Sequence, residues 1–387
     1  MGVKKKKAYY FDYKLLAIVI CLICFGLVML YSTSLYSAGK KFNDNMYYFR
    51  KQAIISAGSL VVMLIVSKIN YHIYEKLAKF AYVLSFILMG LVLVPGVGIE
   101  AYGARRWIKL PFGMQMQPAE VTKIAIIILI PLLICQAGRQ IKEWKTTGII
   151  LAWGAIAALG VLLLTDNLST AIIVAGMVCV MIFVAYPKTL PLLGIAGSIL
   201  GLAAVIINYI DKNIQTSDDF RIRRILAWLH PEQFMDDGGF QVMQGLYAIG
   251  SGGYFGKGLG NSAQKMVIPE AQNDMIFSVI CEELGLVGII VMLLLFAALL
   301  HRLMFIAQNA PDLYGTLMTT GIFAHIAIQV VFNISVVLGI LPPTGVTLPF
   351  ISYGGTSILF LMIEMGLALA VSAKIKMEDT VECQESN

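Results

Sequence analysis

The sequence predicts an all-α, polytopic membrane protein with about ten transmembrane helices, and three observations support this class. Of the 387 residues, 58% are apolar and only 13% are charged, whereas soluble domains have about 45–50% and about 25%. The mean hydropathy is +0.80. The apolar residues also form stretches near the length of about 20 residues that crosses a bilayer. The alternating ten-residue strands of a membrane barrel are not found, so helices are the remaining solution.

Each predicted span is an apolar stretch bounded by polar turns. We expect a basic cytoplasmic N-terminus over 1–13, a membrane domain over 14–373 and a cytoplasmic tail over 374–387, with a large extracellular loop, 211–273, between the seventh and eighth helices. The predicted spans are 14–35, 50–69, 77–96, 118–137, 146–164, 169–187, 189–210, 274–300, 314–340 and 350–373.

The distribution of cations predicts the orientation. Lys4–Lys7 and Lys14 precede and open the first span, and such a positive flank stays in the cytoplasm. Ten spans then return the C-terminus, with Lys374 and Lys376, to the same side. Long loops cross the membrane regardless of their charge, so the loop over 211–273 is predicted to face outward.

Net charge and cysteine content exclude several classes. A formal charge of +6 is too small to indicate nucleic-acid binding, although it leaves anionic lipid open as a partner. Cys21 and Cys24 have CxxC spacing, but on an apolar span without a second pair they are interpreted as packing residues. With four histidines in total, a histidine-rich metal site is not expected.

Ionisable residues inside apolar spans are costly and therefore indicate functional sites. Glu120 and Lys123 are three residues apart, so they share a helix face and can pair. Glu282 and Glu283 point about 100° apart, and we expect one of them to pair inside the bundle. Asp166 can be interpreted either as a functional carboxylate or as an ordinary helix cap, because it stands just before an apolar stretch. The set is completed by Asp274 and Glu364.

Asp274 stands at the junction of the outer loop and the eighth span. The positive end of the helix dipole is expected to favour its ionised form, which suits a carboxylate that accepts a proton or holds a cation. A plain helix cap is the alternative.

The outer loop has two patterns of its own. Residues 220–229 place apolar side chains at 222, 225, 226 and 229, which predicts an amphipathic helix with Arg221 and Arg224 at head-group level. Membrane anchoring alone is the alternative. Nine glycines then fall between 238 and 260, and they are interpreted as backbone that approaches a polar ligand closely, with Lys257 and Lys265 beside it.

A proline- and glycine-rich turn, 341–357, interrupts the apolar pattern between the ninth and tenth spans. Non-helical backbone at membrane depth is tolerated where it lines a cavity or is buried in protein. We therefore expect an outward cavity that is walled by this turn, by the glycine-rich segment and by Arg105, Arg106 and Trp107.

These motifs, in this order, resemble those of the SEDS family (shape, elongation, division and sporulation), in its FtsW/SpoVE branch more than in RodA. The resemblance covers residues 10–375; one departure is Asn167-Leu168-Ser169, where the family usually has Leu-Gly after the aspartate. The motifs are Gly103–Ile108, Gln117–Lys123, Asp166–Thr170, Tyr247–Gly253, Gly256–Gly260, Pro269–Asp274, Glu282–Gly285 and Leu348–Gly355.

The resemblance implies a multi-pass enzyme of the bacterial plasma membrane that polymerises lipid II into β-1,4 glycan strands, with inversion and release of undecaprenyl pyrophosphate. It implies that Asp274 is catalytic, as a general base or as the ligand of a divalent cation, Mg²⁺ or Mn²⁺. The implied partners are a class B penicillin-binding transpeptidase and other division or elongation proteins, and no nucleic acid. The residues expected to bind substrate are Arg105, Arg106, Glu120, Lys123, Arg221, Arg224, Lys257, Gln264, Lys265 and Ser352.

Two other functions stay open at this stage. The first is a lipid II flippase, although the two halves of the chain lack the matching broken helices that many transporters have. The second is a structural hub for division proteins, which would leave the carboxylate of Asp274 unexplained.

Overall fold

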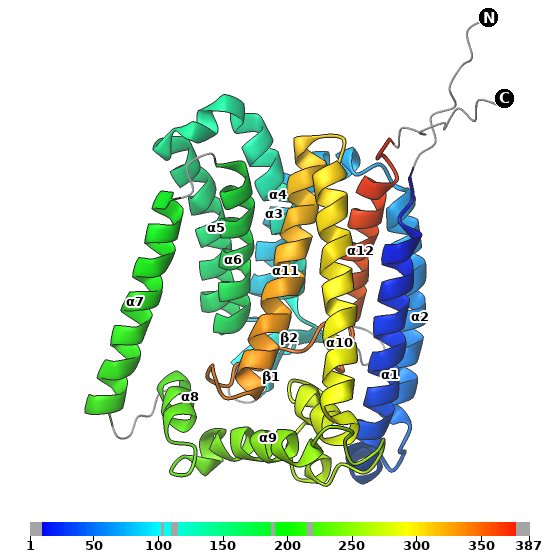
Figure 1. Cartoon of the computed structure of the whole chain (residues 1–387). Coiled ribbons are helices and arrows are strands. Elements are labelled where there is room, and N and C mark those ends of the chain that lie inside the picture. The colour runs from blue at the N-terminus through cyan, green and yellow to red at the C-terminus, as the bar shows by residue number, and fades with distance from the viewer. Residues whose placement is uncertain (1–9, 102–103, 110–114, 187–189, 215–219, 377–387) are drawn as a thin grey trace, which may run out of the picture.

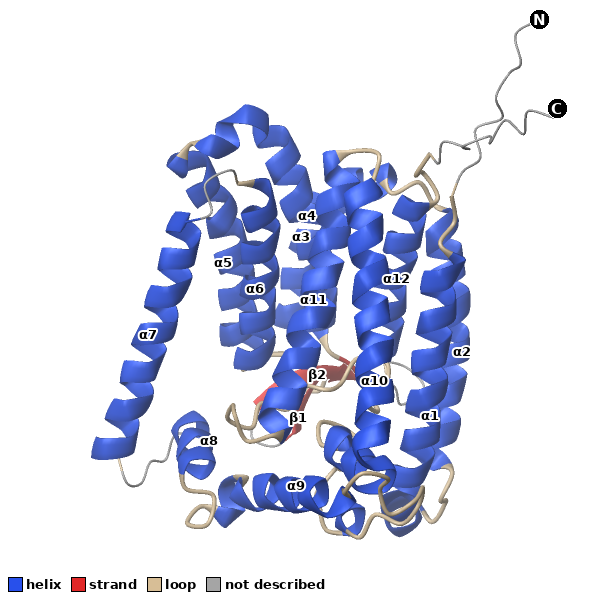
Figure 2. Cartoon of the chain, in the orientation of Figure 1, coloured by secondary structure: helices blue, strands red, loops and turns tan. Residues whose placement is uncertain are grey.

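The computed structural model of the chain describes residues 10–101, 104–109, 115–186, 190–214 and 220–376. The chain forms a bundle of long helices, and both ends of the described chain lie at the same end of the bundle (Figure 1). That end is called the proximal end here, and the opposite end the distal end. The distal end carries the strands and the two short helices of the long loop (Figure 2).

A helix lies in each predicted apolar stretch. Seven of the described helices are long and apolar enough to cross a membrane, namely α1, α2, α4, α5, α6, α10 and α11. The all-helical membrane class is therefore confirmed, and the count of ten crossings stays a prediction. The long helices are α1 (Tyr13–Phe42), α2 (Tyr47–Lys68), α3 (His72–Leu91), α4 (Pro118–Ala137), α5 (Trp144–Thr165), α6 (Leu168–Ala185), α7 (Leu190–Asn213), α10 (Ile276–Asn309), α11 (Leu313–Val337) and α12 (Ser357–Ser372).

A small sheet departs from the prediction of helices alone. Strands β1 (Gly98–Ala101), β2 (Ala104–Lys109) and β3 (Gln115–Met116) form an antiparallel sheet in the order β1-β2-β3. Ile99 lies opposite Trp107, and Glu100 lies opposite Arg105. The sheet joins α3 to α4 at the distal end. An open strand edge is tolerated outside the hydrocarbon core of a bilayer, where water can satisfy its backbone groups.

The long loop contains helices of its own. The predicted amphipathic helix is confirmed as α8 (Phe220–Leu229), with Leu226 and Ala227 buried. It is followed by η3 (Met235–Asp237), α9 (Gly239–Gly252) and η4 (Gln264–Met266). Most of the predicted loop is thus ordered backbone that covers the distal end of the bundle (Figure 1).

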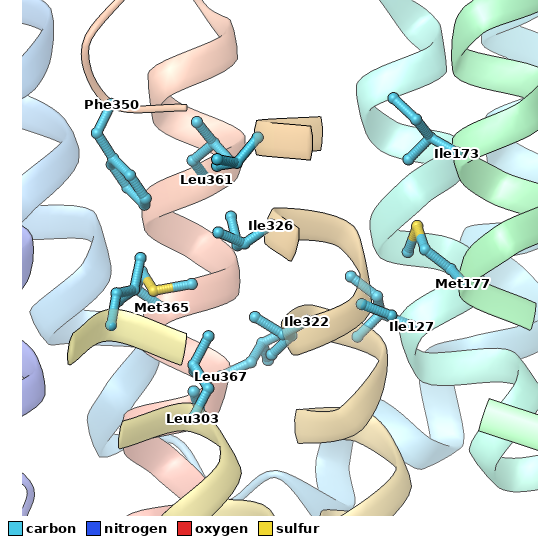
Figure 3. Packing of buried hydrophobic residues seen from close by; sticks show 14 of the residues in the cluster. Ile127, Ile173, Met177, Leu303, Ile322, Ile326, Phe350, Leu361, Met365 and Leu367 are labelled. Atoms are coloured by element: carbon cyan, nitrogen blue, oxygen red, sulfur yellow. The ribbon is translucent and has the colours of Figure 1, made fainter. Parts of the chain in front are cut away.

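The core lies among α4, α6, α10, α11 and α12. Ile127, Met177, Ile322, Leu361 and Met365 pack together there (Figure 3). In a bilayer such packing contributes through dispersion and close fit, since lipid tails are as apolar as leucine. This packed centre holds α11 and α12 in place, and both helices lead into the distal turn that joins them.

Candidate functional site

Asp274 lies in the turn just before α10, and a buried amide on α11 fixes its backbone. The side-chain nitrogen of Asn333, Nδ2, donates to the carbonyl oxygen of Asp274 at 2.8 Å and to that of Val346 at 2.8 Å. Asn333 is fully buried. One side chain therefore joins the Asp274 turn to the proline-rich turn between α11 and α12.

The carboxyl group of Asp274 is half-buried, and it accepts a hydrogen bond from an amide. Gln241 on α9 donates from Nε2 to Oδ1 at 3.3 Å. Desolvation raises the pKa of Asp274 to about 6, because the neighbouring atoms displace water even though part of the side chain remains accessible. Burial therefore outweighs the effect of the helix dipole, which was expected to favour the ionised form of Asp274. A carboxyl with this pKa ionises close to neutral pH.

Arg224 brings positive charge to the same place from α8. Its Nη1 donates to the carbonyl oxygen of Pro343 at 3.3 Å, and its charge lowers the pKa of Asp274 against the larger effect of burial. Trp228 anchors α8 by donating to the carbonyl oxygen of Gly339 at 2.7 Å. The side chain of the other predicted arginine of this helix, Arg221, lies outside the described residues.

Arg106 contacts the junction of α5 and α6, and the start of α6 in turn contacts the proline-rich turn. It donates from Nη2 to the carbonyl oxygen of Asp166 at 2.9 Å, and Ser169 donates from Oγ to the carbonyl oxygen of Thr344 at 3.0 Å. Arg105 instead pairs with Glu100 of the neighbouring strand, with Nε 3.2 Å from Oε2. The turn thus accepts hydrogen bonds from Asn333, Arg224 and Ser169, and the outward cavity that it was expected to wall stays a prediction.

Asp166 and Ser352 shape backbone at this end of the molecule. Asp166 has a positive φ of 49° and ends α5, whereas Asn167 caps α6 by accepting from the backbone nitrogen of Thr170. Ser352 is buried and accepts from the backbone nitrogen of Leu348 at 2.8 Å. The N-cap of α6 is therefore Asn167, and Asp166, for which a capping role was left open, lies one residue before it.

Lys257 and Lys265 are joined to α10 and not assembled around Asp274. Lys257 lies 2.6 Å from Glu282, and the buried Lys265 lies 2.9 Å from Glu283. The backbone nitrogen of Gln264 also donates to Glu282, at 3.2 Å. Both glutamates are paired, where one pair was expected. They lie about 9–10 Å along α10 from its first residue, Ile276, whereas Asp274 precedes this helix.

The glycines of the loop serve a kink in α10. Gly285 has a φ of 62°, and a Cβ atom there would lie 2.3 Å from the backbone nitrogen of Gly256. The carbonyl oxygens of Glu282 and Glu283, which the kink frees, accept from the backbone nitrogens of Lys257 and Gly258 at 2.9 Å each. The close approach predicted from these glycines is therefore backbone against backbone, because a kinked helix must satisfy its freed groups.

A chain of buried ionisable side chains crosses the centre of the bundle. Lys123 lies 2.9 Å from Glu120 and 2.9 Å from Nε2 of His325, and Nδ1 of His325 lies 2.7 Å from Glu364. All four side chains are buried. Since the lysine can only donate, Nε2 of His325 accepts and its Nδ1–H donates to Glu364. The predicted Glu120–Lys123 pair is confirmed, and its extension to α11 and α12 was not predicted.

A dedicated metal cage at Asp274 is not found among the described residues. Among the described residues, no three His, Cys, Asp or Glu side chains are grouped to hold a metal ion. The Asp274 carboxyl accepts a hydrogen bond from the amide of Gln241, and Arg224 adds positive charge. A divalent cation at Asp274 would need most of its ligands from substrate phosphates and water, so it stays a prediction, and no chemical step below depends on it.

Together these features define a polytopic helical membrane protein with one half-buried, high-pKa carboxylate at its distal end, next to an arginine-bearing amphipathic helix. The family model described as "Cell cycle protein", which covers FtsW, RodA and SpoVE, matches residues 13–377. The chain belongs to this FtsW/RodA/SpoVE family.

Similar proteins agree in sequence and in fold. Stage V sporulation protein E of Bacillus subtilis is 37% identical over 368 residues, which are 93% of this chain and 96% of that protein. The probable peptidoglycan glycosyltransferase FtsW of Trichlorobacter lovleyi is also 37% identical, over 95% of this chain and 94% of its own. A solved structure described as "Structural coordination of polymerization and crosslinking by a peptidoglycan synthase complex" has a TM-score of 0.75 at 29% identity, covering 95% of this chain and 99% of its own. The crystal structure of the rod shape determining protein RodA of Thermus thermophilus has a TM-score of 0.65 at 26% identity, covering 95% and 98%.

Proposed function

We propose that this chain is a peptidoglycan glycosyltransferase. It joins the disaccharides of lipid II into β-1,4 glycan strands at the outer face of the membrane and releases undecaprenyl pyrophosphate. A relative at 37% identity carries the name of this activity. The observation that carries the proposal within the structure is Asp274, a half-buried carboxylate with a pKa of about 6 in a family motif.

Asp274 acts as the general base in this reaction. Its carboxylate takes the proton from the 4-hydroxyl of the acceptor sugar as that oxygen attacks the anomeric carbon of the donor. The bond from this carbon to the pyrophosphate oxygen breaks, and attack from the opposite face inverts the α-linked donor to a β-1,4 product. A base is most effective when its pKa lies near the working pH, and burial brings Asp274 toward that range.

The leaving pyrophosphate needs positive charge, and arginine binds phosphate oxygens in bidentate geometry. Arg224 is the strongest candidate, because its charge already acts on Asp274. Arg106 contributes from the Asp166 side of the proline-rich turn, with Arg105 and Arg221 as further candidates. Lys257, Gln264, Lys265 and Ser352 support the site by holding loops and turns, and Glu120 with Lys123 supports it from the bundle interior.

The chain is a multi-pass membrane protein, and we place it in the bacterial plasma membrane. Its proposed partner is a class B penicillin-binding transpeptidase, since the similar complex coordinates polymerisation with crosslinking. Other division or elongation proteins complete the assembly.

A lipid II flippase is the alternative, and the buried chain from Glu120 to Glu364 is the observation that favours it, because ionisable relays inside a bundle are typical of transporters. Purified full-length protein with its transpeptidase partner is given fluorescent lipid II, and glycan chain length is followed on gels. In parallel, proteoliposomes report movement of labelled lipid II between leaflets. Polymerisation without flipping supports the glycosyltransferase, and flipping without polymer would replace it with the flippase.

A further inference from the structure

A cluster of aromatic rings lies at the distal end of the bundle, where the chain passes from α1 to α2 (Figure 1). The rings of Phe42, which ends α1, and Tyr47, which begins α2, are stacked with their centroids 3.9 Å apart. Tyr48 contacts both rings edge to face, with centroid distances of 5.5 and 5.6 Å. Phe42 is 40% exposed, whereas Tyr48 is buried. Tyr48 therefore supports a stacked pair that has accessible aromatic surface.

The length of α1 places this pair beyond the hydrocarbon core of the bilayer. Helix α1 has 30 residues, of which about 20 are needed to cross the hydrocarbon. The predicted span starts in its first turn, so about ten further residues extend about 15 Å on the distal side. The exposed amides of Asn43 and Asn45 follow directly. Anchoring at head-group level, a usual role of membrane aromatics, thus fits Tyr36 better than the stacked pair.

The cluster is joined to the segment that carries Asp274. Tyr353 of the proline-rich turn contacts Tyr48 edge to face, with the ring centroids 4.9 Å apart. The backbone nitrogen of Tyr353 donates to the carbonyl oxygen of Gln272 at 2.9 Å, and Gln272 is two residues before Asp274 in the chain. A continuous line of contacts therefore runs from the Asp274 turn to the stacked pair.

Lysines lie around the stacked pair. The Nζ atoms of Lys41 and Lys51 are 5.9 and 5.8 Å from the centres of the two stacked rings, and Lys40 is exposed beside them. Two acidic side chains nearby, Glu270 and Asp44, are each in an ion pair, with Lys41 at 3.8 Å and with an arginine at 2.6 Å. Positive charge exceeds negative charge around the rings, which favours an anionic ligand.

Accessible aromatic surface, exposed amides and lysines together suit a carbohydrate that carries carboxylates. One face of a pyranose ring consists of C–H groups, and these pack favourably on an aromatic ring. The hydroxyl and acetamido groups at the edge of the sugar can bond to side-chain amides, which both donate and accept. Stem peptides on a peptidoglycan strand end in carboxylates, so the strand also meets the lysines with the complementary charge.

We propose that Phe42 and Tyr47 bind the glycan strand as it leaves the candidate site. Sugar rings pack on the stacked pair, and Asn43 and Asn45 bond to their polar groups. The lysines around the rings pair with the carboxylates of the stem peptides. This inference rests on the proposed function and adds a second site, for the product strand, to the one around Asp274.

Binding without turnover tests the proposal. Full-length protein with Asp274→Asn is titrated with soluble, uncrosslinked peptidoglycan strands, and the dissociation constant is measured by microscale thermophoresis. Phe42→Ala/Tyr47→Ala in the same background should weaken binding about tenfold, because the aromatic contacts are lost. The matched control Tyr36→Ala removes an exposed aromatic side chain of α1 that lies outside the cluster, and it should bind the strands as its parent does. Equal affinity of the double variant and its parent would overturn the proposal.

Further variants separate stacking from folding and from charge. Phe42→Leu keeps the apolar bulk and loses the aromatic face, so it should bind more weakly at an unchanged unfolding temperature, whereas Phe42→Trp should retain the strand. Equal affinities of these two variants would overturn the stacking role. Lys40→Gln/Lys51→Gln should weaken the binding of strands with stem peptides and leave that of peptide-free hexa-N-acetylchitohexaose unchanged. Equal effects on both probes would contradict the role of charge.

Polymerisation assays separate this inference from the proposed function. With Asp274 intact, Phe42→Ala/Tyr47→Ala should still make polymer and release shorter strands, because the product is held less tightly. A wild type that makes no polymer would contradict the proposed function alone, since the binding measurement does not depend on turnover. Strands of wild-type length from the double variant would overturn the inference while polymerisation itself stands.

Discussion

Asp274 can act as a base only in its ionised form, so its pKa fixes the expected pH dependence. Burial places that pKa at about 6, above the ordinary 3.8. We expect kcat/KM for lipid II polymerisation to fall about tenfold per pH unit below pH 6 and to level off above about pH 7. The measurement is the initial rate between pH 4.5 and 8 at constant ionic strength.

Gln241 provides the control for this pH profile. Its amide donates to Oδ1 of Asp274 and so favours the ionised form. Gln241→Leu should therefore move the inflection to higher pH. An inflection near pH 4 in the wild type, or an unchanged profile in Gln241→Leu, would contradict the assignment of the inflection to Asp274.

Asn333 is a positioning residue for Asp274. Asn333→Leu removes both donated hydrogen bonds, to Asp274 and to Val346, and a displacement near 1 Å at a reacting group reduces rates by about a hundredfold. We expect kcat to fall by that order, with a smaller change in KM. The measurement is steady-state polymerisation with the purified variant.

Gln329→Leu is the matched control for Asn333, because Gln329 lies one turn away on α11 and donates only to Thr347, at 2.9 Å. Both variants lose a buried amide and should unfold at similarly lowered temperatures. Only Asn333→Leu should lose most of its kcat. Equal losses of activity in the two variants would show that Asn333 acts through the fold alone.

Three helices are tied together by the chain of Glu120, Lys123, His325 and Glu364, which joins α4, α11 and α12. Lys123→Met leaves Glu120 buried without its cation, and breaking a buried pair costs about 3–5 kcal/mol. For a chain of this size we expect the midpoint of thermal unfolding to fall by about 4–6 °C. Differential scanning fluorimetry in detergent measures it.

The double variant Glu120→Gln/Lys123→Met shows whether charge imbalance is the cause. With the carboxylate neutralised, most of the lost stability should return, because a buried pair replaced by neutral groups is often near neutral in free energy. A double variant that is as unstable as Lys123→Met would instead assign the loss to packing.

The sequence also contains a signal for the polar side chains of α11, but this signal is weaker than that of the charged residues. His325, Gln329 and Asn333 are spaced four apart in an apolar span, so they form one stripe on one helix face. The two amides carry no charge, so the free-energy cost of burying an ionisable group does not reveal them. That cost does reveal Asp274, Glu120 and Lys123, because an ionisable group is expensive to place in a membrane span.

Loop residues were harder to assign than helix residues. The period of apolar residues predicted α8 to the residue, since the stripe is local information. The pairing of Lys257 with Glu282 and of Lys265 with Glu283 depends on how the loop folds back on α10. That arrangement requires the kink at Gly285, which a periodic apolar pattern does not reveal.

At the scale of the whole molecule, helix positions were predictable from hydropathy because the bilayer allows few alternatives. The first and last residues of the helices were less predictable. The tenth stretch, 350–373, begins with a turn, and helix α12 covers only Ser357–Ser372. The sheet at the distal end lies where water and protein can satisfy strand edges, so the constraint that predicts helices does not apply to it.

The orientation in the membrane is a property of the whole molecule, and it can be tested by labelling. If both ends of the chain are cytoplasmic, a green fluorescent protein fused to the C-terminus is fluorescent in cells. In a background without the six native cysteines, Phe255→Cys, at a position 83% exposed on the distal end, should react with a membrane-impermeant maleimide. Lys142→Cys at the proximal end should react only after lysis. The reverse labelling pattern would contradict the orientation.

General-base catalysis by Asp274 is tested most directly by measuring the polymerisation of fluorescent lipid II by the Asp274→Asn variant. This variant keeps the shape of the side chain and removes its basicity, and Glu270→Gln is the control because Glu270 is a neighbouring carboxylate that acts on Asp274 through its charge. We predict that Asp274→Asn loses at least about a hundredfold in rate with an unchanged unfolding temperature, while Glu270→Gln keeps most of its activity. Polymerisation by Asp274→Asn at the wild-type rate would contradict the assignment of Asp274 as the catalytic base.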